Sequence, residues 1–198
     1  VKFGANYTRH NFEPETTTST YLAREDSVLL SDTSATAKGS AAFANELSVY
    51  VDDDWKLFDN LSLNIGLAHT IFNLENKTYH NLQPRVSLKY DPTDFLTLKA
   101  SYSRMTQCVH LLTSSPLAMP TDLWVPITEE LEPEVANQYS VGAYTKIDGW
   151  EFSIEGYYKV SDNVLEYKDG MNFAGFSGSW EKLVAAGQGV SRGIEFMA

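Results

Sequence analysis

The stretch DPTDFLTLKASYSRM, residues 91–105, decides the fold class of this chain. From Leu96 onward, apolar and polar residues alternate. The first set is Leu96, Leu98, Ala100 and Tyr102, and the second is Thr97, Lys99, Ser101 and Ser103. A period of two predicts a β-strand, because successive side chains leave a pleated backbone on opposite faces. The apolar face must be covered by another sheet, by helices or by lipid, and each cover implies a different class of protein.

The composition excludes several classes of structure and function. The chain has 198 residues, of which 43% are hydrophobic, and this fraction is too high for a disordered protein. A net charge of −11 argues against nucleic-acid binding, because phosphate groups would be repelled. Cys108 lies in an apolar run, so we expect a buried thiol rather than a nucleophile. No apolar run approaches the roughly 20 residues that a membrane helix needs.

Periodicity along the chain predicts about eight strands and little helix. The expected strands are residues 1–12, 41–57, 61–73, 82–91, 95–106, 134–147, 150–161 and 189–198. Short helical turns are the alternative near Val109 and near Glu181. Because the sequence is strand-like at both ends, and cut strands would leave unpaired backbone groups, we expect an internal segment of a longer polypeptide.

The connections between the expected strands alternate in length. Short turns rich in Asp, Asn, Gly and Pro fall at residues 58–60, 91–94 and 148–149. Longer connections are expected at residues 13–40, 74–81, 107–133 and 162–188. In an up-and-down meander, alternate connections lie at the same end of the sheet. A sheet with short turns at one end and long loops at the other is typical of an outer-membrane barrel, in which lipid covers the apolar face.

Aromatic residues gather near both ends of the expected strands, which is consistent with two interfacial belts but also with the general preference of aromatics for strands. The set near the short turns is Trp55, Phe58, Tyr90, Phe95, Trp150 and Phe152, and the set near the loops is Phe72, Tyr102, Tyr157 and Tyr158. The run Asp52–Asp54 interrupts this pattern, because Asp53 falls on the apolar face. We expect a solvated acidic patch there, at the membrane interface.

Four segments taken together resemble the TonB-dependent receptors of Gram-negative outer membranes. They are VYVDDDWKLFDNLSLNIGL (49–67), QPRVSLKYDPTDFLTLKASYSR (83–104), LEPEVANQYSVGAY (131–144) and GQGVSRGIEF (187–196), which follow one another in the family's order. The segment PTDLWVP (120–126) is similar to receptors of Bacteroides-like bacteria. The resemblance implies an all-β fold: an antiparallel up-and-down meander of about eight strands, within a transmembrane barrel of about 22 strands.

The same resemblance implies a function and a location. Residues 1–198 would be a segment of the barrel domain, without the plug domain and the terminal strands. The expected function is to bind an external nutrient and import it with energy from the inner membrane, at the outer membrane of the cell. The implied partners are outer-membrane lipid, the nutrient, the TonB complex acting through the plug, and a surface lipoprotein. A passive outer-membrane channel and a soluble β-sandwich ligand-binding module remain as alternatives.

Nothing in the sequence indicates an enzyme. The four histidines are scattered without metal-ligand spacing, no nucleophile or phosphate-loop motif occurs, and we expect no cofactor and no metal. Large aromatic side chains among small polar residues in the loops are candidate contacts for a ligand. These candidates are Trp124, Phe173, Phe176 and Trp180. The alternative is that these side chains pack one loop against another.

Overall fold

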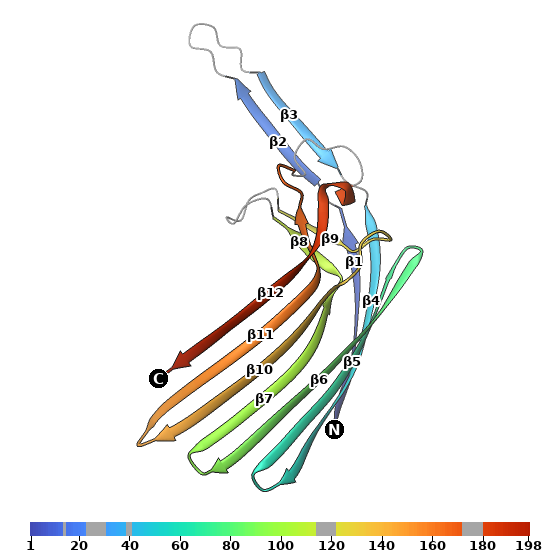
Figure 1. The fold of residues 1–198 in the computed structure, drawn as a ribbon. Helices are drawn as coiled ribbons and strands as arrows, with labels where there is room; N and C mark the ends of the chain where they lie inside the picture. Colours follow the sequence, from blue (N-terminus) through green and yellow to red (C-terminus); the bar gives the residue numbers. More distant parts are fainter. Residues whose placement is uncertain (14, 23–30, 39–40, 114–121, 172–179) are drawn as a thin grey trace.

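A curved antiparallel sheet of eight long strands dominates the computed structural model, which describes residues 1–13, 15–22, 31–38, 41–113, 122–171 and 180–198 (Figure 1). The strands are β1 (Lys2–Phe12), β4 (Ala42–Phe58), β5 (Leu61–Leu74), β6 (Lys77–Thr93), β7 (Leu96–Gln107), β10 (Glu134–Ile147), β11 (Trp150–Tyr167) and β12 (Val184–Met197). They follow one another in the sheet in this same order. The expected all-β class and antiparallel meander are therefore confirmed.

Two hairpins and a short helix are inserted between the long strands. The hairpins are β2 (Glu15–Leu22) with β3 (Ser31–Lys38), and β8 (Val109–Leu112) with β9 (Leu123–Pro126); the helix is the 3-10 turn η1 (Trp180–Leu183). The helical alternative near Glu181 is thus confirmed. The one near Val109 is wrong, because this segment pairs with β9, a partner distant in sequence. In the described part of the chain, no helix combines the length and hydrophobicity needed to cross a membrane.

The three short turns close the sheet at one end, as expected (Figure 1). At the turn from β10 to β11, Asp148 and Gly149 have φ angles of 52° and 87°, the left-handed conformation that two-residue hairpin turns need. At the opposite end, the loop expected over residues 74–81 is wrong. β5 and β6 pair almost to the turn, and the Asn73 side chain donates to Thr78 Oγ1 at 2.8 Å. Polar residues that suggested a loop therefore extend the strand ladder instead.

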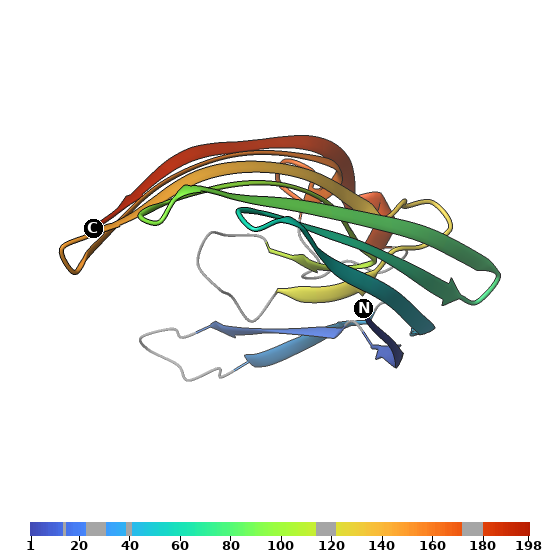
Figure 2. The same ribbon diagram turned by 90° about the horizontal axis from the view of Figure 1, so that it is seen from below.

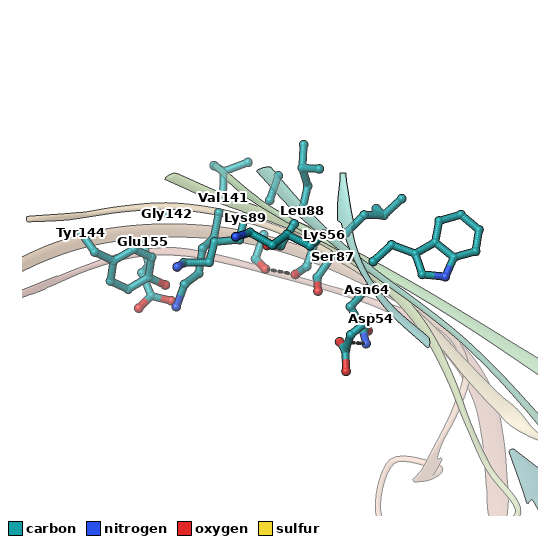
Figure 3. Close-up of a pocket in the computed structure, with 17 residues that line it drawn as sticks. Asp54, Lys56, Asn64, Ser87, Leu88, Lys89, Val141, Gly142, Tyr144 and Glu155 are labelled. Atoms are coloured by element: carbon teal, nitrogen blue, oxygen red, sulfur yellow. Dashed lines mark hydrogen bonds between the residues drawn. The ribbon is translucent and has the colours of Figure 1, made fainter. Parts of the chain in front are cut away.

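The sheet has one apolar and one polar face, and the strand register shows how they arise. One row of register partners is Leu63, Leu88, Ala100, Val141, Gly156 and Ile194. The adjacent row is Asn64, Ser87, Ser101, Ser140, Tyr157 and Gly193. Figure 2 shows the sheet as an arc, and in Figure 3 Leu88 and Val141 point away from the concave side. The alternation in β7 therefore separates a convex apolar face from a concave polar one.

The expected aromatic belts are only partly present. Tyr102, Tyr139 and Tyr158 are register partners on the convex face, and the rings of Tyr102 and Tyr139 lie 5.1 Å apart. Phe72 and Tyr157 do not belong to this belt. Phe72 is fully buried on the concave side, and Tyr157 lies on the concave row. Both point to the concave side, away from the tyrosine row on the convex face. A position near the loop end of a strand therefore does not predict the face of a side chain without strand parity.

Asp53 does lie on the convex face near the short turns, where the indole Nε1 of Trp55 donates to its carboxylate at 2.5 Å. The other two acids of the run behave differently, because they face the concave side. Asp54 accepts from the Asn64 amide at 2.7 Å, and Asp52 pairs with Arg85. The expectation of one solvated acidic patch is therefore wrong: strand parity divides the three carboxylates between two faces.

If lipid covers the convex face, an arginine in place of Leu98 should destabilise the complete receptor by about 2 kcal/mol. The cost of such a charge is roughly 2–4 kcal/mol at the midplane and falls toward the interfaces. The control is Lys99→Arg, on the concave face, where the cation stays over the Tyr144 ring and stability should change little. Denaturant titration after refolding into bilayers measures both variants. A neutral Leu98→Arg would show that this face does not meet hydrocarbon.

Candidate functional site

A hollow on the concave face extends from β4 to β11, with charged and hydroxyl side chains in its lining and a volume of about 590 Å³ (Figure 3). Within it, Lys89 and Lys99 stand directly opposite each other on β6 and β7. The Lys89 ammonium lies 2.8 Å from Asp91, and the Lys99 ammonium lies 4.3 Å from the centre of the Tyr144 ring. These contacts offset the repulsion expected between facing like charges. The hollow thus presents positively and negatively charged side chains to whatever fills the concave side.

Glycine at position 66 permits an ion pair that crosses an entire strand. Arg85 on β6 reaches Asp52 on β4, and its Nε donates to Asp52 Oδ1 at 2.8 Å. Gly66 on β5 stands between them in the register, and a Cβ atom there would lie only 2.1 Å from the Asp52 carboxylate. Any larger residue would displace one of the two charged groups. The pair clamps three strands on the concave face, and it is a feature that sequence analysis did not find.

At the loop end, the concave face changes from polar to apolar and becomes a packed core. This cluster, which we call the loop-end core, consists of Phe12, Ala44, Phe72, Leu74, Tyr79, Cys108 and Ile127. The last two residues belong to the chain that flanks the β8–β9 hairpin, and the Ile127 amide donates to the Cys108 carbonyl at 2.9 Å. The Tyr79 hydroxyl donates to the Thr128 carbonyl at 2.5 Å. The loop between β7 and β10 is therefore held against the concave face of the sheet by packing and by hydrogen bonds.

A second cluster seats the β8–β9 hairpin itself on the concave side, as Figure 2 shows. Its members are Leu112, Leu123, Val125, Leu165, Trp180, Leu183 and Val184. The hairpin contributes one face to this cluster, while β11, η1 and β12 contribute the rest. His110 on the same buried face has its pKa lowered by desolvation, which favours the neutral imidazole. Two loops that are far apart in sequence thus share one core on the concave side of the long sheet.

The structure separates the loop aromatics that sequence analysis grouped together. Trp180 is only 5% exposed and packs within the second cluster, as the packing alternative expected. Trp124 is 58% exposed and faces Leu111, which is 42% exposed, across the outer face of the hairpin. Phe173 and Phe176 lie outside the described residues. The alternation within LWVP (residues 123–126) predicts that Trp124 points away from Leu123 and Val125, and the structure shows this arrangement.

Within the ranges that the structure describes, no group of three or more His, Cys, Asp or Glu side chains could hold a metal ion. What these surfaces offer is binding: a hydrogen-bonding hollow on the concave face and an apolar platform on a fixed hairpin.

The family of the chain follows from a comparison with known proteins. A family model described as "TonB dependent receptor-like, beta-barrel" matches residues 1–198. The chain therefore belongs to the TonB-dependent receptors and matches their β-barrel across its whole length. This is a family of receptors and transporters rather than of enzymes. No curated protein matches the chain in sequence.

Two solved structures, with TM-scores above 0.5, support the same fold. The siderophore receptor PirA from Pseudomonas aeruginosa superposes with a TM-score of 0.60 at 15% identity, over 96% of this chain and 39% of that one. The FpvAI–pyocin S2 complex gives 0.52 at 13% identity, over 98% and 31%. The alcaligin receptor FauA from Bordetella pertussis gives 0.47 at 15%, over 98% and 36%. The chain thus spans between 31% and 39% of the length of these proteins.

The packing of the loop-end core predicts that Cys108 resists alkylation at pH 8. Burial, with a smaller contribution from the Glu46 carboxylate, raises the pKa of its thiol to about 12. The reactive thiolate is then roughly one part in ten thousand at pH 8, compared with about a tenth for a thiol of pKa 9. Mass spectrometry after a timed iodoacetamide pulse on the folded receptor measures the modification. Rapid labelling in the folded state, matching that in denaturant, would mean that the loop does not stay on the wall.

Proposed function

We propose that this chain forms part of the barrel wall of an outer-membrane receptor that binds an external nutrient and imports it with energy delivered through TonB. The observation that carries the proposal is the family match over residues 1–198, combined with a sheet that is apolar on its convex face and polar on its concave one. A single layer of this kind fits a wall between lipid and water.

In this proposal the three regions of the chain do different work. The convex face meets the lipid of the outer membrane. The concave hollow, with its mixed charges, faces the plug domain, which we place outside residues 1–198 together with the strands that complete the barrel. The short turns lie at the periplasmic side and the hairpins at the cell surface, as the turn asymmetry of outer-membrane barrels requires. Energy reaches the receptor through the plug.

The exposed face of the β8–β9 hairpin is the proposed place of nutrient contact. Trp124 offers a flat, rigid ring that can stack on a ligand at low entropic cost. Its neighbours on the other face of the hairpin are anchored in the second cluster, so the platform is held in place before a ligand arrives. Preorganisation of this kind favours affinity, because fewer groups must be ordered on binding. Trp180 then acts as a support beneath the platform rather than as a contact.

Energy dependence tests the proposed function against its main rival, a passive channel. Cells that carry the receptor should bind their nutrient when the proton gradient is collapsed or TonB is deleted, but should stop accumulating it. Binding and uptake of the radiolabelled nutrient, identified by growth of a deletion strain on defined media, give the two readouts. Unchanged uptake without TonB would favour the passive channel.

Replacing Trp124 with alanine should weaken nutrient binding about 30-fold, since loss of a well-placed aromatic contact costs on the order of 2 kcal/mol. Titration with purified receptor measures the affinity, and outer-membrane abundance should not change. Trp124→Phe keeps a stacking ring and should recover most of the loss.

Trp180→Ala is the matched contrast. It should open a cavity in the second cluster and destabilise the loop by roughly 3–5 kcal/mol, visible as faster proteolysis of the hairpin. If Trp124→Ala binds the nutrient with unaltered affinity, recognition lies in the plug or in other loops.

A further inference from the structure

Two of the four histidines meet on the outer face of the β5–β6 hairpin, although no metal-ligand spacing links them in the sequence. The rings of His69 on β5 and His80 on β6 have centroids 5.5 Å apart, and their planes are inclined by only 23°. In the register His69 faces Leu82 and His80 faces Ile71, so the two imidazoles are diagonal neighbours on one face. Strand pairing therefore brings together two side chains that the sequence alone does not connect.

Neither imidazole is engaged by another polar group. In the part of the chain that the structure describes, His69 and His80 contact each other but take part in no hydrogen bond or ion pair. The other two histidines differ, because His10 Nε2 lies 3.0 Å from Glu46 Oε2 and His110 is only 4% exposed. His80 is exposed and His69 is half-buried. The ring nitrogens of this pair are thus accessible and free to bind a ligand.

The separation of the two rings matches that of two imidazoles on one metal ion. A histidine nitrogen lies about 2.0–2.1 Å from zinc, which places the ring centroid roughly 3.2 Å from the ion. Two rings at a tetrahedral angle then have centroids about 5 Å apart, close to the 5.5 Å between His69 and His80. Rotation of the two side chains within their strands turns one nitrogen of each ring toward a shared ion.

The backbone holds the two histidines in place before an ion arrives. β5 and β6 pair without a register shift from Leu61–Tyr90 to Leu74–Lys77. The pairing of β6 with β7 starts only at Arg85, so among the described strands β5 alone pairs with the loop end of β6. An ion bound by one histidine from each strand would cross-link the hairpin where it has least support.

The pair lies at the loop-end rim of the proposed wall. His69 is the ninth residue of β5 counted from the short turn, and His80 is level with Ile71, the eleventh. A strand crosses the hydrocarbon core in about 9–11 residues. The two imidazoles are therefore placed at the outer boundary of the membrane, where ions dissolved in the external water can reach them.

We propose that His69 and His80 form a binding site for one divalent transition-metal ion of the copper and zinc class, completed by water. Imidazole suits both metals, and the general order of affinities places Cu²⁺ above Zn²⁺. The site needs only two side-chain ligands, so it differs from the larger clusters that the described ranges lack. The bound ion fastens β5 to β6 from outside. The inference goes beyond nutrient import and does not depend on it.

Copper titration of the complete receptor, purified in detergent, measures this site. Each variant is compared with the unaltered receptor, so that copper bound elsewhere cancels. His69→Gln and His80→Gln should each weaken one Cu²⁺ site on the order of a hundredfold, because a second linked ligand adds at least that much to the affinity. Pulsed electron paramagnetic resonance should detect two imidazole nitrogens on this copper in the unaltered receptor and one in either variant.

His10→Gln is the matched control, since its ring is paired with Glu46 on the concave side. This variant should bind copper as the unaltered receptor does. Zinc gives a second readout: amide hydrogen exchange between Asn73 and Tyr79 should slow in the unaltered receptor, but not in His80→Gln. Equal copper affinity in the unaltered receptor and in both single variants would overturn the proposal and leave the rings as a stacked pair only.

Discussion

Backbone hydrogen bonding in a layer one strand thick is the constraint on which the rest of this structure depends. In hydrocarbon no water is available to satisfy an amide or a carbonyl, so each strand must pair along its whole length with its neighbours. The long antiparallel register from β1 to β12 supplies this pairing between neighbouring strands of the chain, and it also determines which way each side chain points. Strand parity then determines the polarity of each face. The row through Ala100 is apolar on the convex side, and the row through Ser101 is polar on the concave side.

At their loop ends the same strands are built differently. Toward the loops the concave face needs a cover of its own, because Phe72 and Leu74 replace the polar residues found nearer the short turns. Ile127 and Cys108 provide that cover, and the β8–β9 hairpin is anchored beside them. An anchored hairpin is the result, with Trp124 exposed on its outer face. Anchoring and the proposed ligand contact thus lie on opposite faces of one short hairpin.

Much of this fold could be predicted from the sequence, because a period of two determines both strand and face. The stretch around Leu98 identified the apolar side, and Asp148–Gly149 marked a tight turn. Errors arose where long-range pairing decided the outcome. Val109 entered a strand because of a partner at Pro126, and the polar residues near Asn73 extended a ladder rather than a loop. The same limit applied to the site, since the Asp52–Arg85 pair exists only once neighbouring strands are in register.

Water access to alternate positions of β7 tests the central claim most directly. In the complete receptor, single cysteines would replace Leu96, Leu98 and Ala100 in one set and Thr97, Lys99 and Ser101 in the other, and a membrane-impermeant thiol reagent would be applied to both membrane faces of permeabilised cells. Cys108 would be changed to serine, so that each variant carries one thiol. A wall between lipid and water predicts labelling of the second set alone. Equal labelling of both sets would contradict the assignment of the convex face to lipid.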